Sequence, residues 1–274
     1  MNSGRRCPAQ FAEPAAINHT TEGDRVSMSS STPAASGQPN GSGSEIESFT
    51  RAMIVVAHPD DAEFSSAGTL AKFAKEGKHV VLVLCTSGDK GTARRDISSP
   101  ELAALREGEQ LEASKRLGLA ETVFLRLGDG ELVPDLAFRE KVVRQIRTHR
   151  PDILITHDPF RPYALHPDHR AVGITAVDSV YPTARDPLYF PEHLQDGLEP
   201  HKVAELWLYG SEAPDTFIDI SETFDTKIHA LKAHQSQVGT AETLEQRMRD
   251  RAEELGREHG LPMAETFKVV KMRR

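Results

Sequence analysis

The sequence has no surplus of basic residues, since 33 Lys and Arg stand against 41 Asp and Glu in 274 residues. The resulting net charge of −8 argues against nucleic acid as a partner, because phosphate binding needs a basic patch. No apolar run approaches the ~20 residues that cross a bilayer, and no apolar segment follows Arg5 and Arg6 as a signal peptide requires. We therefore predict a cytoplasmic protein with no membrane segment and no nucleic-acid partner.

Cysteine is also scarce, and apolar residues are sparse near the N-terminus. Cys7 lies in a polar segment and Cys85 ends an apolar run, so we expect no disulfide and a buried Cys85 thiol. Residues 1–48 are rich in Ser, Gly, Pro, Asn and Thr and bury too little surface to offset the entropy of ordering. We predict a disordered tail over 1–48 and a single α/β domain over 49–274.

After residue 51, short apolar runs alternate with segments of helical periodicity. The predicted strands are 53–57, 79–85, 122–125, 153–156, about 204–209, 216–218 and 267–272. The predicted helices are 66–76, 99–117, 136–149, 171–180, 221–234 and 241–258, with Ser99 and Ser221 as N-caps. Strands that are nearly continuous in hydrophobes and separated by helices indicate a Rossmann-like, mainly parallel sheet with helices on both faces.

Polar side chains that could bind a metal or transfer protons follow the first predicted strand. The segment Ala57–Glu63 reads Ala-His-Pro-Asp-Asp-Ala-Glu, so His58, Asp60 and Asp61 stand where a buried strand would end. Packing does not explain this run, whereas an imidazole and one carboxylate could hold a metal while the second carboxylate moves protons. Spacing alone does not decide which carboxylate has which role.

A second such segment, His166-Pro167-Asp168-His169, lies in the loop after the fourth strand. Ligands of parallel sheets bind beyond the carboxyl ends of the strands, so both segments are expected on one rim, with Asp129 and His157 beside them. Two imidazoles and one carboxylate with an open position are the donor set of a catalytic metal site. The other interpretation is a hydrogen-bonded loop in which Asp168 caps the following helix, and both interpretations can be true at once.

With these motifs the chain resembles the PIG-L/LmbE family of zinc-dependent N-deacetylases, which act on N-acetylglucosamine-containing conjugates. The resemblance covers nearly everything after the tail and is specific at Ala57–Glu63 and His166–His169. Weaker matches lie at 68–70, 86–92, 106–109, 151–152 and 234–237. Asp89 stands where the family more often has Glu.

The resemblance implies a role for each motif residue. The implied metal ligands are His58, Asp61 and His169. Asp60 is then the general base, His166 polarises the amide carbonyl or protonates the leaving amine, and Asp168 orients an imidazole. Zn²⁺ is the expected cofactor, although a two-His, one-carboxylate set also suits Fe²⁺.

Substrate contacts are less well defined by the sequence. Arg94 is a candidate for binding sugar hydroxyls or a phosphate, with a solvated charge as the equal alternative. Asp129 resembles the family's sugar-binding carboxylate, and the alternative is turn chemistry between two glycines. Arg106 and Glu109, at helical spacing, are expected to form a surface ion pair. Residues 161–165 are a candidate lid with Tyr163 pointing inward.

The sequence thus predicts a hydrolase that removes the N-acetyl group from an N-acetylglucosamine-containing small molecule, releasing acetate and a free amine. The alternatives are an amidase that cleaves a related sugar–thiol conjugate and a non-catalytic sugar- or metal-binding protein. Asp60 beside the ligand set argues against the last, because a pure binding site needs no base. The aglycone of this N-acetylated amino-sugar partner stays open, and so does assembly into an oligomer.

Overall fold

A seven-stranded sheet organises the part of the chain that the computed structural model describes, residues 49–239 and 243–272. The predicted disordered tail, residues 1–48, lies outside these residues. The strand order is β3-β2-β1-β4-β5-β7-β6. The strands are β1 (Arg51–Val56), β2 (His79–Thr86), β3 (Glu121–Leu127), β4 (Ile153–His157), β5 (Glu205–Tyr209), β6 (Thr216–Asp219) and β7 (Ala264–Lys271).

The direction of the strands confirms the mainly parallel sheet. β1, β2, β3, β4 and β5 run parallel to one another, whereas β7 pairs antiparallel with both β5 and β6. The chain first adds β2 and β3 on one side of β1 and then returns to place β4 on the other side. The strand order therefore switches between β1 and β4, where this class of sheet binds ligands.

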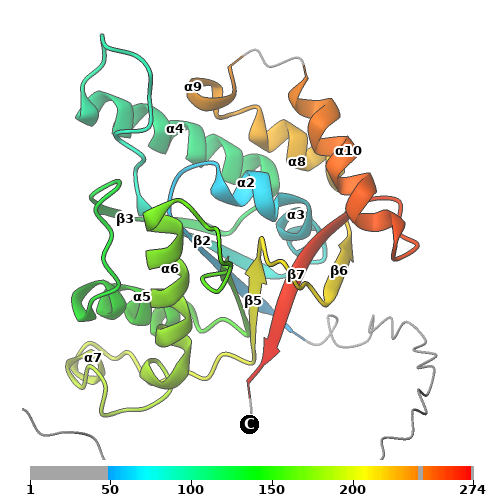
Figure 1. Ribbon diagram of the computed structural model, residues 1–274. Coiled ribbons are helices and arrows are strands. Elements are labelled where there is room, and N and C mark those ends of the chain that lie inside the picture. Colours follow the sequence, from blue (N-terminus) through cyan, green and yellow to red (C-terminus); the bar gives the residue numbers. More distant parts are fainter. Residues whose placement is uncertain (1–48, 240–242, 273–274) are drawn as a thin grey trace, which may run out of the picture. The chain divides into compact units, whose positions relative to one another are not determined.

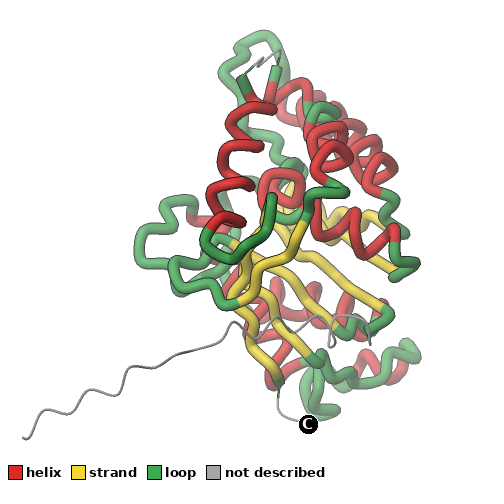
Figure 2. Tube along the Cα trace, turned by 90° about the vertical axis from the view of Figure 1, so that its right-hand side faces the viewer, coloured by secondary structure: helices red, strands yellow, loops and turns green. Residues whose placement is uncertain are grey.

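Helices cover both faces of the sheet, as predicted (Figures 1 and 2). One face carries α2 (Asp61–Ser65), α3 (Ala67–Lys75), α4 (Ser99–Leu117), α8 (Phe224–Leu231) and α10 (Leu244–Arg257). The other carries α5 (Leu136–His149) and α6 (Pro167–Asp178). Short connections contain η1 (Ser179–Thr183), α7 (Glu192–Gln195) and α9 (Gln235–Val238).

The alternation of side chains along β1 divides the core into two layers. Ile54 and Val56 pack into the cluster under α3 and α8, while Met53 and Val55 pack under α5 and α6. All four side chains are fully buried. Burying such a side chain contributes about 1.5–3 kcal/mol each, so this strand anchors both layers. The buried free thiol of Cys85, on β2, is also confirmed.

The sequence misplaced several helix ends. Ser98 rather than Ser99 caps α4, in a capping box with Glu101, and Thr223 rather than Ser221 precedes α8. α6 begins at Pro167, earlier than expected, and the five-residue α2 was not predicted. In the described ranges, no helix is both long enough and apolar enough to cross a membrane.

Candidate active site

The strand ends bring polar side chains to one rim of the sheet, as predicted. His58 follows β1, Asp129 follows β3, and His157 ends β4. Because these strands are parallel, their carboxyl ends lie on the same rim. α6 starts beside them with the second motif, and the rings of His58 and His166 have centroids 4.6 Å apart. The two motifs therefore meet in space although 102 residues, 64–165, separate them in the chain.

Seven side chains at this rim form what we call the histidine–aspartate cluster. Its members are His58, Asp61, Asp129, His157, His166, Asp168 and His169. Three overlapping groups in the cluster each have donor atoms within 4.8 Å of one another, close enough to share an ion. The cluster contains every predicted metal ligand.

The three predicted metal ligands meet at the Asp61 carboxylate. Its Oδ1 lies 3.3 Å from Nε2 of His169, and its Oδ2 lies 3.5 Å from Nδ1 of His58. Oδ2 is also 3.4 Å from Nε2 of His157, which extends the donor set beyond the three residues named from the sequence. Among the groups with donor atoms within 4.8 Å of one another, Asp61 stands with His157 and His169, and His58 stands with His166 and His169. The Asp61 group has two imidazoles and one carboxylate, a donor arrangement that suits a divalent cation.

Electrostatics in the cluster favour positive charge. Burial lowers the pKa of His58, but hydrogen bonds to Asp129 and Asp61 outweigh it and raise that pKa to about 10. Burial raises the pKa of Asp61, yet hydrogen bonds from His157, His169 and His58 hold it well below its usual range. A buried site that keeps a proton on an imidazole at alkaline pH is one that attracts cations.

The second motif opens α6 in a way that the sequence did not reveal. His166 is the N-cap, because its Nδ1 accepts a hydrogen bond from the N–H of Asp168 at 3.2 Å. The expectation that Asp168 caps this helix is wrong, whereas the expected hydrogen bonds between Asp168 and a loop are present. The Asp168 side chain turns inward instead, with Oδ2 3.1 Å from Nε2 of His58, and accepts the N–H of Gly130 at 2.7 Å. Asp168 therefore faces the imidazole of His58. Because Nδ1 of His166 accepts a hydrogen bond, the proton of a neutral His166 is on Nε2.

Asp60 lies at the start of α2 in a strained backbone conformation. Its φ is 88°, in the left-handed region, which costs a residue with a side chain ~1–2 kcal/mol. The N–H of Asp60 donates to Oε1 of Gln110 at 3.2 Å, and its Oδ2 lies 3.3 Å from the Arg106 guanidinium. Burial first, and then the charge of Asp61, raise the pKa of Asp60 to about 7. Such a carboxyl can exchange a proton near neutral pH.

Arg106 is the site residue that the sequence analysis misjudged. Its guanidinium is buried and donates to the carbonyls of Gly88 and Pro59, each at 2.8 Å, besides its contact with Asp60. The surface ion pair with Glu109 is therefore wrong. Glu109 instead accepts hydrogen bonds from the N–H and Oγ of Ser236, at 2.8 and 2.6 Å.

Glycine makes room for this arginine. A Cβ at Gly88 would lie 2.2 Å from the Arg106 guanidinium, and one at Gly91 would lie 2.9 Å away. Gly88 also has a φ of +63°, a conformation that favours glycine. The two glycines in the loop after β2 were the available sequence signal that a bulky side chain lies against that loop.

A buried polar network contacts Asp60 through Gln110, which accepts the N–H of Asp60. Nε2 of Gln110 donates to Oε1 of Glu63 at 2.8 Å, while Oε2 of Glu63 lies 3.4 Å from Nε2 of His234. Glu63, Gln110 and His234 are all fully buried. The weak family match at 234–237 thus lies next to the first motif, because His234 contacts Glu63.

The two predicted substrate contacts are placed differently. Asp129 belongs to the cluster: its Oδ1 is 3.1 Å from Nε2 of His58, and its Oδ2 accepts the N–H of Lys90. Arg94 lies outside the cluster, in an exposed loop where its guanidinium pairs with Asp96 at 3.1 and 2.9 Å. The side chain of Tyr163 is 77% exposed rather than turned inward.

Comparison with known proteins gives consistent matches. The PIG-L family model, described as GlcNAc-PI de-N-acetylase, matches residues 53–180. Diacetylchitobiose deacetylase of Thermococcus kodakarensis is 34% identical over 187 residues, covering 68% of this chain and 70% of that protein. A 1D-myo-inositol 2-acetamido-2-deoxy-alpha-D-glucopyranoside deacetylase of Rhodococcus erythropolis is 31% identical over 245 residues, covering 71% of this chain and 83% of that protein.

A solved structure agrees with these sequence matches. N,N'-diacetylchitobiose deacetylase from Pyrococcus horikoshii, in complex with an inhibitor, superposes with a TM-score of 0.78 at 30% identity. The superposition covers 82% of this chain and 85% of that one. The family model spans both motifs, and with the 34% identity to a relative covered over 70% of its length, the chain belongs to the PIG-L family.

Proposed function

We propose that the protein is a metal-dependent N-deacetylase that hydrolyses the acetamide of an N-acetylglucosamine-containing small molecule. The observation that carries this proposal is the position of Asp60. A carboxyl with a pKa of about 7 stands directly beside a metal-type donor set, on the rim where the fold binds ligands. The relatives named as deacetylases of diacetylchitobiose and of 1D-myo-inositol 2-acetamido-2-deoxy-alpha-D-glucopyranoside support the same chemistry.

The donor set fits Zn²⁺, with His58, Asp61 and His169 as the proposed ligands. Two imidazoles and one carboxylate leave positions open, and His157 and Asp168 hold those ligands from behind through Asp61 and His58. A divalent cation bound there would acidify a water molecule and polarise the acetamide carbonyl. Fe²⁺ suits the same donors, so metal analysis has to identify the ion.

Asp60 is proposed to act first as the general base and then as the general acid. Its carboxylate takes a proton from the attacking water as the oxygen adds to the acetamide carbon. It then gives that proton to the amine nitrogen as the C–N bond breaks, which yields acetate and a free amine. The pKa of Asp60 is about 7 without metal, and a bound cation would lower it, so Asp60 is a carboxylate able to accept the proton at neutral pH, and the acid that forms can pass that proton to the amine nitrogen.

His166 is proposed to stabilise the oxyanion as a neutral donor. Burial, and then the charges of His58 and His169, lower the pKa of His166, so its neutral form dominates at pH 7. Because Nδ1 accepts the Asp168 N–H, the ring proton lies on Nε2 and can be donated to the developing negative charge. Of the two roles implied by the family, polarising the carbonyl fits this geometry better than protonating the amine.

The substrate is proposed to be a small N-acetylated amino-sugar conjugate, with Asp129 as a candidate contact. The names of the relatives cover both an oligosaccharide and an inositol conjugate, so the acetamide and its sugar are the shared part. The loop around Arg94 adjoins the rim and stays a candidate for contacting the aglycone. Cytoplasmic location and a small-molecule partner also remain proposals.

An acetate-release assay tests the proposed function. The full-length protein, stripped of metal and reloaded with Zn²⁺ or Fe²⁺, is incubated with N,N'-diacetylchitobiose, N-acetylglucosaminyl inositol and free N-acetylglucosamine. We expect acetate from at least one conjugate, only in the metal-loaded protein. Cleavage of a sugar–thiol amide without acetate release would favour the amidase alternative, and stoichiometric metal without turnover of any substrate would contradict the proposal.

A further inference from the structure

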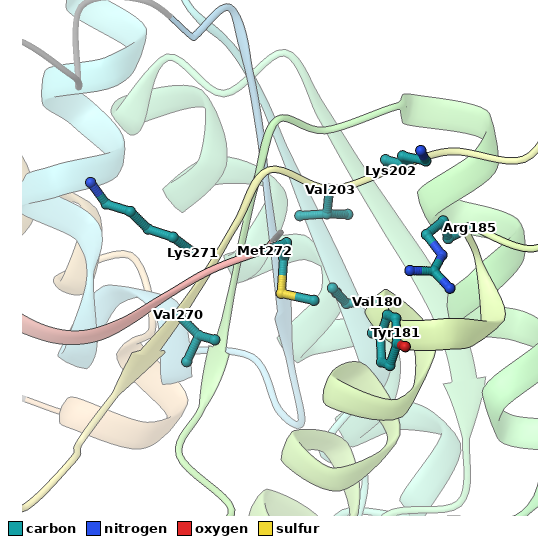
Figure 3. Close-up of a pocket in the computed structure, with 8 residues that line it drawn as sticks. All are labelled: Val180, Tyr181, Arg185, Lys202, Val203, Val270, Lys271 and Met272. Carbon is teal, nitrogen blue, oxygen red and sulfur yellow. The ribbon is translucent and has the colours of Figure 1, made fainter. Parts of the chain in front are cut away.

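A cavity of about 280 Å³ opens at the end of the sheet opposite to the histidine–aspartate cluster (Figure 3). Lys202 and Val203 lie just before β5, whereas the rim follows the other end of the parallel strands. Tyr181 lies beyond the last turn of α6, whose first turn carries His166. The cavity is therefore separate from the proposed deacetylation site and has no role in that chemistry.

The cavity has two chemically different sides. Its lining consists of Val180, Tyr181, Arg185, Lys202, Val203, Val270, Lys271 and Met272. Figure 3 shows the valines and Met272 gathered on one side, Arg185 and Lys202 on the other, and the Lys271 side chain directed away. Val180 and Val203 belong to the core cluster under α5 and α6, so the apolar side is an opening onto the core.

The polar side of the cavity carries a net positive charge, because two cationic side chains, Arg185 and Lys202, have one carboxylate partner, Asp186. Arg185 forms a bidentate pair with Asp186, at 2.8 and 3.0 Å, and lies over the Tyr181 ring at 4.4 Å. The Lys202 charge acts on the same Asp186 carboxylate, and no hydrogen bond or salt bridge joins Lys202 to another described residue. Two cations thus share one carboxylate, and no acidic residue lines the cavity.

The excess positive charge at this cavity is opposite in sign to the net charge of the whole chain, which is −8. A neutral apolar ligand would use the valines but leave the excess charge unmatched. An inorganic anion would match the charge but leave an apolar opening in contact with water, which is unfavourable. A ligand that joins an anionic head to an apolar body satisfies both sides.

We propose that this cavity binds a small amphipathic carboxylate, with its head between Arg185 and Lys202 and its body against Val180, Val203 and Met272. The volume lies just below the ~300–1,000 Å³ of sites for drug-sized ligands, so the body is compact, such as one aromatic ring or a short alkyl chain. The Arg185 guanidinium lies 4.4 Å from the centroid of the Tyr181 ring, a cation–π contact that helps to hold it beside the head group.

A ligand-observed NMR titration of the full-length, metal-loaded protein tests this proposal with 4-phenylbutanoate as the probe. Its amide and its amine analogue, 4-phenylbutanamide and 4-phenylbutylamine, keep the body and change the head. We expect the carboxylate to bind with a Kd of about 1 mM or tighter, and the amide at least about tenfold more weakly. The amine should not bind, because its cation meets the excess positive charge.

Substitutions of residues that line the cavity test whether the probe binds there. Lys202→Met and Arg185→Met should each weaken carboxylate binding about fivefold, and Val270→Trp, at a 41% exposed position, should block the cavity. Lys115→Met, an exposed lysine on α4, is the matched control and should bind as the unaltered protein does. Deacetylation should be unchanged in all four variants.

Three outcomes would overturn the proposal. Equal affinity for the carboxylate and the amide would show that the cations do not recognise the head. Binding that survives in Lys202→Met and Val270→Trp but disappears on metal chelation would place the probe at the histidine–aspartate cluster. A concentration-dependent mass that Val270→Trp abolishes, without probe binding, would show that a second copy of the chain covers the cavity.

Discussion

Replacing Arg106 with Met tests how much the buried guanidinium beside Asp60 contributes to the free energy of unfolding. The side chain is 4% exposed and donates to two carbonyls at 2.8 Å, as well as contacting Asp60 at 3.3 Å. Removing one partner of a buried charge pair costs about 3–5 kcal/mol. Because the Asp60 side chain is 15% exposed and Asp60 can take up a proton, we expect a loss near the lower end, about 3 kcal/mol.

Arg116 on the same helix provides the control. It also makes a salt bridge and a hydrogen bond to a carbonyl, through Glu112 and His229, but its side chain is 22% exposed. Exposed pairs contribute ~0–1 kcal/mol, so Arg116→Met should cost about 1 kcal/mol. Unfolding by guanidinium chloride, followed by circular dichroism, gives the free energy of unfolding of both variants. If Arg106→Met costs no more than Arg116→Met, the reasoning about Arg106 is refuted.

Three further predictions concern the loop, the base and the metal. Gly88→Ala should lower hydrolysis at least about tenfold, because its Cβ would meet Arg106 at 2.2 Å, and Gly77→Ala, with open space around it, is the kinetic control. The kcat/KM should fall as pH drops through the Asp60 pKa, about 7 without metal and lower with a bound cation, since the carboxylate is the active form. In Arg106→Met this acid limb should move to higher pH, because the Arg106 charge lowers that pKa; an unmoved limb would contradict the role of Arg106. Chelation should abolish hydrolysis and lower the melting temperature, and reloading should restore both, whereas undiminished turnover after chelation would contradict a metal-dependent reaction.

Much of the rim could be predicted from the sequence, because a parallel sheet fixes where strand ends lie. The apolar runs of β1 and β4, and the motif that follows each of them, were enough to expect His58 and His166 on one rim, and their rings do contact. That inference needed only strand direction, which the alternation of strands and helices supplies. It needed no knowledge of side-chain geometry.

The parts that could not be predicted depend on contacts between distant elements. Arg106 has helical spacing to Glu109, yet it is buried because the loop around Gly88 packs over it, and periodicity on one helix does not contain that information. His166 caps α6 because Asp168 is drawn inward to His58, a contact across 110 residues. Helix α2 is too short for any period to show.

The most direct test of the account is Asp60→Asn, which removes the base and leaves the proposed metal ligands in place. The metal-loaded variant should bind metal one-to-one and keep its KM within about threefold. Its kcat for acetate release should fall by about 10²–10⁴-fold, the usual contribution of a general base. Asp225→Asn, at a 94% exposed side chain, makes the same chemical change and should remain fully active. Full activity of metal-loaded Asp60→Asn would contradict the assignment of Asp60 as the base, and with it the proposed mechanism.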